Sequence, residues 1–144
     1  MPDRPQKSSS GTRVRPGRVL VVDDQAVVGS ELARSLPDHD VVAVECGEDA
    51  LAILAAGQRF DLILCDVIMQ GMNGTAMLAS LEADLAAQAE RVVFMADRMV
   101  SPIVQYLLDG VPNLCLERPL DLDGLRALIE RRIRTVPDAR SAAR

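Results

Sequence analysis

The chain has 144 residues, of which 49% are apolar and 26% charged, so it fits one globular domain and is not wholly disordered. Its longest apolar run, residues 50–56, is far shorter than the roughly 20 residues that cross a bilayer. No signal-peptide pattern precedes Val19, so we expect a cytoplasmic protein without membrane contact. The net charge is −5, and the acidic body lacks the basic face typical of nucleic-acid-binding domains.

The two ends of the chain are basic, in contrast to the body between them. Residues 1–17 are rich in Pro, Ser, Gly and Arg and show no apolar period, which predicts a disordered basic arm. We expect one folded domain over residues 18–134 and a short C-terminal tail over 135–144. Both ends are interpreted as solvated segments, with contact to an acidic partner as the alternative.

Short apolar runs alternate with helical patterns from Arg18 onward. The runs predict five buried strands, at residues 19–22, 41–44, 62–65, 92–95 and 114–116. A first helix ends before Pro37, and a second spans about 48–56 and stops at Gly57. A third helix carries Leu78, Leu81 and Leu85 on one face. A fourth helix begins at Ser101-Pro102 and ends at Gly110, and a fifth helix begins at Asp121.

Five strand-helix units of this length predict an α/β fold of the flavodoxin-like, doubly wound type. The simplest arrangement is a (βα)5 parallel sheet with strand order 2-1-3-4-5 and helices on both faces. In such sheets, functional groups gather at the carboxyl ends of the strands, beside the point where the strand order reverses. Here that point lies between the first and third strands.

Three acidic residues stand at these two strand ends. Asp23 and Asp24 follow the first strand, and Asp66 follows the third. Two carboxylates about 4 Å apart repel by roughly 4 kcal/mol at an effective dielectric near 20. A divalent cation relieves this repulsion, and ligands that are all oxygen atoms suit Mg²⁺. The alternative is helix capping by Asp23 or Asp24 and a simple turn at Asp66.

Three stretches of the sequence carry a family resemblance. They are Val-Leu-Val-Val-Asp-Asp at 19–24, Asp-Val-Ile-Met-Gln-Gly-Met-Asn-Gly at 66–74 and Leu-Glu-Arg-Pro-Leu at 116–120. Together they resemble the signature stretches of receiver domains of two-component response regulators. The last stretch is similar to receivers at the C-terminal end of hybrid histidine kinases. The resemblance covers about residues 18–134.

The resemblance implies a phosphoacceptor module in a phosphorelay. Asp66 would take a phosphoryl group from the phosphohistidine of a histidine kinase or phosphotransfer protein. Asp24 and Asp66 would bind Mg²⁺ directly, Asp23 through water, and the backbone carbonyl of Ile68 would add another oxygen. Such a chain is a phosphoprotein of signal transduction and not an enzyme. Its usual contact face, for a downstream protein or a second copy, is formed by the fourth predicted helix, the fifth strand and the fifth helix.

Several positions depart from the family pattern. Ala96 stands where receivers carry the Thr or Ser whose hydroxyl binds the phosphoryl group. Asp97 follows, where a small residue is usual, and brings negative charge towards that group. Cys115 replaces the aromatic switch residue of many receivers, and Gln70 replaces a proline. The usual coupled movement of hydroxyl and aromatic side chains therefore cannot operate.

Arg118 replaces the family's lysine, and this exchange is not conservative, because a planar guanidinium differs from a point charge. Two roles are open for it: an ion pair with Asp66 or Asp97, or contact with a phosphoryl group. We therefore place Arg118 beside Asp66 as a second reacting-site residue.

Two other functions compete with the phosphoacceptor. The lost switch residues favour a pseudo-receiver, an interaction module that works without phosphorylation. A phosphohydrolase with an aspartyl nucleophile requires a second acid two residues later, where this chain has Ile68. The three cysteines, Cys46, Cys65 and Cys115, are expected to be reduced, buried thiols and not a disulfide or zinc site.

Overall fold

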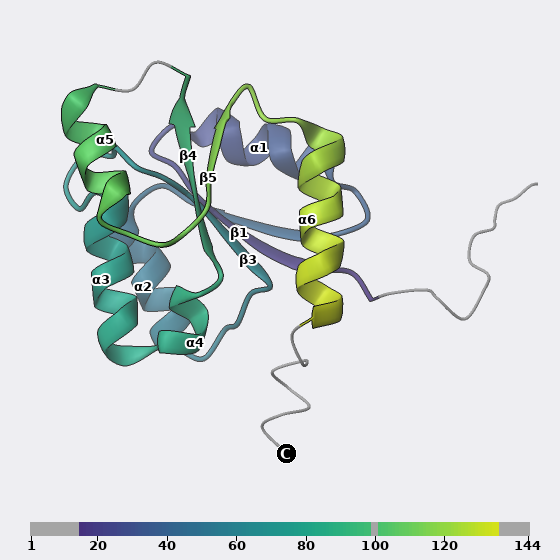
Figure 1. Ribbon diagram of the computed structural model, residues 1–144. Helices are drawn as coiled ribbons and strands as arrows, with labels where there is room; N and C mark the ends of the chain where they lie inside the picture. The colour runs from purple at the N-terminus through teal and green to yellow at the C-terminus, as the bar shows by residue number, and fades with distance from the viewer. Residues whose placement is uncertain (1–14, 99–100, 136–144) are drawn as a thin grey trace, which may run out of the picture.

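The computed structural model describes residues 15–98 and 101–135 (Figure 1). The strands are β1 (Arg18–Val22), β2 (Asp40–Val44), β3 (Leu62–Asp66), β4 (Val92–Asp97) and β5 (Cys115–Arg118). The helices are α1 (Ala26–Ser35), α2 (Gly47–Ala55), α3 (Gly74–Asp84), α4 (Ala86–Ala89), α5 (Pro102–Asp109) and α6 (Leu122–Thr135). Strands and helices alternate along the chain, apart from the additional short helix α4.

The five strands form one parallel sheet in the order β2-β1-β3-β4-β5, which confirms the predicted topology. The strand order reverses next to β1, so β1 and β3 are neighbours although β2 lies between them in the chain. Their register pairs Val22 with Cys65. The residues that follow Val22 and Cys65 therefore emerge side by side at the carboxyl edge of the sheet.

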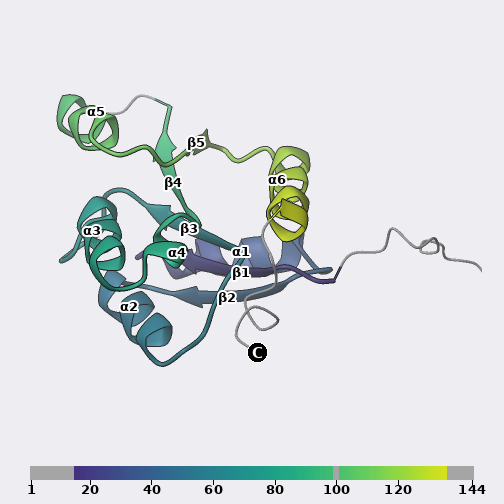
Figure 2. The same cartoon turned by 60° about the horizontal axis from the view of Figure 1, so that its bottom comes forward.

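Helices cover both faces of the sheet, with α2, α3 and α5 on one face and α1 and α6 on the other (Figure 2). Successive residues of a strand point to opposite faces. In β1, Leu20 and Val22 pack towards α2 and α3, whereas Val19 and Val21 pack towards α1 and α6. Both faces are buried, which explains why the central strands are continuous apolar runs without alternation.

The structure differs from the sequence-based predictions at the third helix, at the fifth strand and in the burial of two cysteines, and the other strands extend one or two residues beyond their predicted bounds. The third helix does not continue to Leu85: α3 ends at Asp84, and Leu85 separates it from α4. Strand β5 begins one residue later than predicted and extends to Arg118. Of the three free cysteines only Cys65 is buried, so the prediction was wrong for Cys46, which caps α2, and for the partly exposed Cys115.

The described residues include three that precede Arg18, where the sequence had suggested the start of folding. Arg15 forms an ion pair with Asp61 at 2.8 Å, and the buried Gly17 donates its N–H to His39 Nδ1. The rest of the basic arm and the C-terminal tail from residue 136 lie outside the described residues. Among the described helices, none combines the length and apolar character needed to cross a membrane.

Candidate functional site

The three predicted acids meet at the carboxyl edge of the sheet. Asp23 and Asp24 directly follow β1, and Asp66 is the last residue of β3. One carboxylate oxygen from each lies within 4.8 Å of those of the other two. The convergence that the strand pattern predicted is therefore confirmed, and these residues form the acidic triad of the site.

Each side chain of the triad accepts a hydrogen bond from a backbone N–H group. Asp23 is buried, and its Oδ1 accepts from the N–H of Gln25 at 2.9 Å. Asp24 is exposed, and its Oδ2 accepts from the N–H of Gln70 at 3.2 Å. The N-cap of α1 is Gln25, with no side-chain capping bond, so the helix-capping alternative for Asp23 and Asp24 was wrong. Asp23 and Asp24 therefore do not cap α1, and each has a carboxylate oxygen close to those of the other triad residues.

Burial raises the pKa of the Asp66 carboxyl, because its charged form loses hydration. The Arg118 guanidinium counteracts this rise, and the nearby charge of Asp23 adds to it. The Ile68 N–H donates to Asp66 Oδ1 at 3.3 Å and lowers the pKa further, while Asp24 raises it. The surroundings of Asp66 thus disfavour its charged form, which makes a bound cation favourable.

Arg118 reaches the triad from β5. Its Nη2 lies 2.8 Å from Asp23 Oδ2 and 3.5 Å from Asp66 Oδ2, and its Nη1 lies 3.6 Å from Asp97 Oδ1. The sequence led us to expect an ion pair with Asp66 or Asp97, and the structure has both. The shortest contact, with Asp23, was not predicted. Three carboxylates therefore share one guanidinium.

The loop from β3 to α3 depends on two glycines with different roles. Gly71 has φ +76°, a left-handed conformation that glycine adopts without strain. Gly74 instead permits close approach: a Cβ there would lie 2.6 Å from the Asp66 carbonyl oxygen and 3.0 Å from the Phe94 ring. The side chain of Asn73 caps α3 by accepting from Ala76 N–H. This packing fixes the backbone at Asp66.

Three positions that depart from the family pattern lie on β4 and β5. Ala96 is buried near the end of β4, and the Asp97 side chain beyond it is 81% exposed. Cys115 is half-buried at the start of β5 and pairs with Phe94, away from the carboxyl edge. Tyr106 lies on α5 and is 77% exposed. No hydroxyl therefore stands at position 96.

The donor set of the triad fits a hard divalent cation. Two direct ligands of Mg²⁺ are at most about 4.2 Å apart, because each metal–oxygen distance is about 2.1 Å. The triad spans up to 4.8 Å, so two direct carboxylates and a third that binds through water match these dimensions. All donors are oxygen atoms, which disfavours softer metals. The acidic pocket is thus of the kind that binds Mg²⁺.

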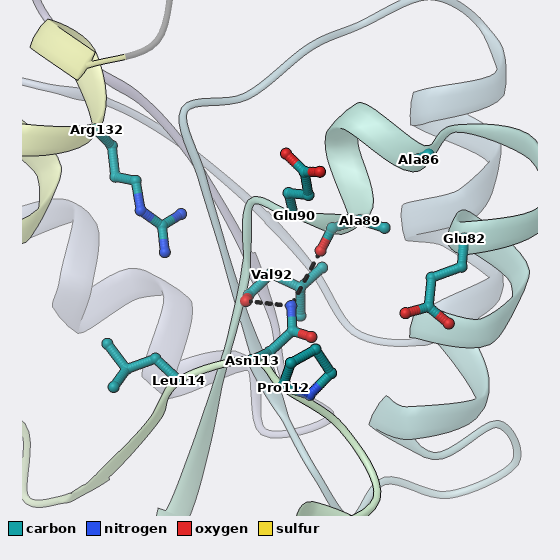
Figure 3. Close-up of a pocket in the computed structure, with 9 residues that line it drawn as sticks. All are labelled: Glu82, Ala86, Ala89, Glu90, Val92, Pro112, Asn113, Leu114 and Arg132. Atoms are coloured by element: carbon teal, nitrogen blue, oxygen red, sulfur yellow. Dashed lines mark hydrogen bonds between the residues drawn. The ribbon is translucent and has the colours of Figure 1, made fainter.

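A second hollow, of about 480 Å³, lies at the opposite, amino-terminal edge of the sheet (Figure 3). Arg132 of α6 points into it, and Asn113 donates to the carbonyl oxygens of Ala89 and Val92 on its floor. Burial and the nearby charges of Arg91 and Arg131 lower the pKa of Arg132. No local sequence pattern indicates this hollow, because its lining comes from five separate segments.

Comparison with known proteins places these features in a family. The family model for the response regulator receiver domain matches residues 19–130. The Regulator of RpoS of Escherichia coli K12 is 32% identical over 115 residues, which are 78% of this chain and 33% of that protein. The Sensor histidine kinase AruS of Pseudomonas aeruginosa is 33% identical over 113 residues, which are 75% of this chain and 11% of that protein. The chain thus spans a third or less of these relatives.

Solved structures agree with this result. The receiver domain of a signal transduction histidine kinase from Syntrophus aciditrophicus superposes with a TM-score of 0.72 at 22% identity, over 84% of this chain and 92% of that one. A response regulator receiver protein from Pseudomonas putida gives 0.69 at 25% identity, over 83% and 99%. Receiver domains are non-catalytic modules of two-component signal transduction. With its flavodoxin-like sheet and its acidic triad, the chain belongs to the response regulator receiver domain family.

Proposed function

We propose that this receiver domain accepts a phosphoryl group on Asp66 from a histidine kinase or phosphotransfer protein, with Mg²⁺ held by the acidic triad. The observation that carries this proposal is the meeting of Asp23, Asp24 and Asp66 within 4.8 Å at the edge of the sheet. A cluster of three carboxylates with one guanidinium is costly for the fold unless a cation offsets it. Stabilisation of the fold therefore does not explain the triad, whereas binding of a cation does.

In the proposed transfer, an Asp66 carboxylate oxygen forms a bond to phosphorus, and the bond from phosphorus to the histidine nitrogen of the donor breaks. The electron pair of that bond stays on the imidazole, which then takes up a proton. No oxidant or further reactant is needed. Phosphoryl transfer depends on charge neutralisation and in-line positioning more than on acid or base groups, so a receiver needs few reacting residues.

The other site residues have supporting roles. Asp24 and Asp66 are proposed as direct ligands of Mg²⁺, Asp23 as a ligand through water, and the Ile68 carbonyl as a further oxygen. Mg²⁺ supplies charge neutralisation when it is bound. Arg118, 3.5 Å from Asp66 Oδ2, is proposed to contact the oxygens of the phosphoryl group through its guanidinium.

Binding of beryllofluoride, a stable mimic of the phosphoryl group, tests this function. In the presence of Mg²⁺, beryllofluoride is expected to shift the amide NMR signals of residues around Asp66. In EDTA, which removes Mg²⁺, beryllofluoride is expected to leave these signals unchanged. Asp66→Asn removes the oxygen that binds beryllium and is expected to abolish the change. An equal response of the wild type and the variant would overturn the proposal.

Two observations favour a second function, the pseudo-receiver. Ala96 offers no hydroxyl, and Asp97 places a carboxylate at the rim of the pocket. Both changes weaken phosphoryl binding, so the module would act through constant protein contacts. Titration with Mg²⁺ separates the two functions: a receiver is expected to show amide shifts at Asp24, Asp66 and Ile68 at millimolar Mg²⁺, and a pseudo-receiver none.

The surface of α5, β5 and α6 is the proposed contact face for a downstream protein or a second copy of the chain. On α5, the side chains of Ile103 and Tyr106 are 67% and 77% exposed. Large apolar side chains exposed on one helix are typical of contact surfaces. The face begins next to Asp97 and Arg118, so a change in the site reaches it over a short distance.

A further inference from the structure

Arg118 is shared between a buried and a surface carboxylate. The side chain of Asp23 is 2% exposed, whereas that of Asp97 is 81% exposed, and the guanidinium contacts both. Its Nη2 lies closest to Asp23, at 2.8 Å, and its Nη1 is 3.6 Å from Asp97. One guanidinium therefore bridges the interior of the pocket and its solvent-facing rim.

The buried end of this bridge uses the same carboxylate as the metal site. Asp23 Oδ1 already accepts from the Gln25 N–H, and Oδ2 accepts from Arg118. A cation or its bound water that approaches Asp23 has to share Oδ2 with the guanidinium or displace it. Two positive groups at one oxygen repel each other, so displacement is favoured in this poorly hydrated place.

Asp97 offers the displaced guanidinium another partner. It stands at the end of β4 and pairs in register with Arg118 on β5, so the two side chains leave neighbouring strands at the same level. A small outward movement of Arg118 exchanges Asp23 for Asp97 without loss of an acidic partner. Because the Asp97 carboxylate is exposed, water hydrates it when Arg118 is not close, so the unpaired carboxylate destabilises the domain little.

We propose that Arg118 is an exchangeable counter-ion: it holds Asp23 when no metal is bound and pairs with Asp97 when a divalent cation takes the triad. Asp97 is then a positioning residue that determines metal affinity through Arg118. This inference rests on the proposed Mg²⁺ site. The exchange also explains why an acid stands at position 97: Asp97 attracts the Arg118 guanidinium away from the metal ligands.

A double-mutant cycle on Mg²⁺ affinity tests the exchange. The dissociation constant is measured by amide NMR for the wild type, Asp97→Asn, Arg118→Met and the double variant. Asp97→Asn is expected to weaken Mg²⁺ binding about five- to tenfold when Arg118 is present, and less than about twofold when it is absent. Arg118→Met alone is expected to tighten binding, because the competitor for Asp23 is lost.

Glu117→Gln is the matched control for charge. Glu117 is exposed on β5 and forms no ion pair with Arg118 among residues 15–98 and 101–135, so its removal changes only the general field. It is expected to weaken Mg²⁺ binding less than about twofold. A similar effect of Asp97→Asn and Glu117→Gln would overturn the exchange.

The Arg118 side-chain NMR signals give an independent measure, which remains usable if Arg118→Met fails to fold. Mg²⁺ is expected to shift the Arg118 Nε–Hε signal in the wild type, and the shift is expected to differ in Asp97→Asn. Additive effects in the cycle, or an unmoved Arg118 signal, would overturn the exchange and leave the metal site intact. Absence of Mg²⁺ binding in all four proteins would overturn the metal site as well.

Discussion

Arg118 Nη2 lies 2.8 Å from Asp23 Oδ2, although the two residues are 95 positions apart. Arg118 ends β5 and Asp23 follows β1, and these two strands are not neighbours in the sheet. The arginine side chain spans the carboxyl edge of the sheet and reaches across β4 and β3 to the deepest acid of the triad. An ion pair of this kind neutralises a buried carboxylate, so each partner depends on the other.

Arg118→Met is expected to destabilise the domain in EDTA by about 2 kcal/mol, because it leaves Asp23 buried without its guanidinium. Added Mg²⁺ is expected to restore part of this loss, since a cation then neutralises the triad. Chemical denaturation with and without Mg²⁺ measures both effects.

Arg126→Met provides the control, because it removes an exposed pair with Asp123 and a bond to the Ser35 carbonyl. The expected loss is below about 1 kcal/mol, with no response to Mg²⁺. Equal losses of unfolding free energy in the two variants would show that the ion pair of Arg118 and Asp23 stabilises the domain no more than an exposed pair does.

Asp66→Asn is expected to stabilise the metal-free domain at neutral pH, because it removes a charge that the folded state disfavours. The folded state raises the pKa of Asp66, mainly by burial, so folding favours the protonated form. The contribution of Asp66 to stability therefore falls as pH rises through the window between its ordinary and its raised pKa. Below that window the carboxyl is protonated in both states, and the two proteins should have the same stability.

Denaturation curves at several pH values in EDTA check this dependence. Asp123→Asn is the control, because its carboxylate is 95% exposed, and its effect on stability should stay near zero throughout. A pH-independent gain in Asp66→Asn would point to improved packing and not to charge.

Gly74→Ala is expected to cost about 2 kcal/mol and to weaken Mg²⁺ binding. The added Cβ would lie 2.6 Å from the Asp66 carbonyl oxygen, so the end of β3 has to move. Thermal or chemical unfolding measures the first effect and a Mg²⁺ titration the second. Gly110→Ala is the control: its nearest atom is at 3.5 Å and its φ is −84°, so no loss is expected. Unchanged stability of Gly74→Ala would contradict the close approach.

Ala96→Ser is expected to tighten beryllofluoride binding about tenfold, because a hydroxyl near the end of β4 donates a hydrogen bond to the charged group. Ala96→Val adds volume without a donor and is expected to bring no gain. The dissociation constants of the wild type and the two variants, measured in Mg²⁺, decide the matter. Equal tightening by both substitutions would assign the effect to packing and not to the hydroxyl.

The sheet order and the meeting of the acidic triad were predictable because they follow from short-range signals. Apolar runs fix the strands, right-handed crossovers fix their order, and parallel strands place Asp23, Asp24 and Asp66 at one edge. The proline at the start of α5 and the glycine after α2 likewise set helix limits correctly, with Gly57 at φ +109°.

Other features depended on contacts between distant segments. The periodic leucines suggested that the third helix includes Leu85, but the chain breaks there, and Ala89 of the short α4 is buried under the sheet. Arg118 pairs with Asp23 because its side chain is long enough to reach across two strands. No local sequence pattern indicates such a contact. Gly74 allows the start of α3 to lie close to Asp66, and nothing in the local sequence indicates this role.

Incubation with phosphoramidate, whose phosphorus–nitrogen bond resembles that of phosphohistidine, tests most directly whether Asp66 is the phosphoacceptor. Intact mass spectrometry is expected to show one phosphoryl group in the presence of Mg²⁺, none in EDTA and none in Asp66→Asn. A phosphoryl group that persists in Asp66→Asn, or an unmodified wild type in Mg²⁺, would show that Asp66 is not the phosphoacceptor.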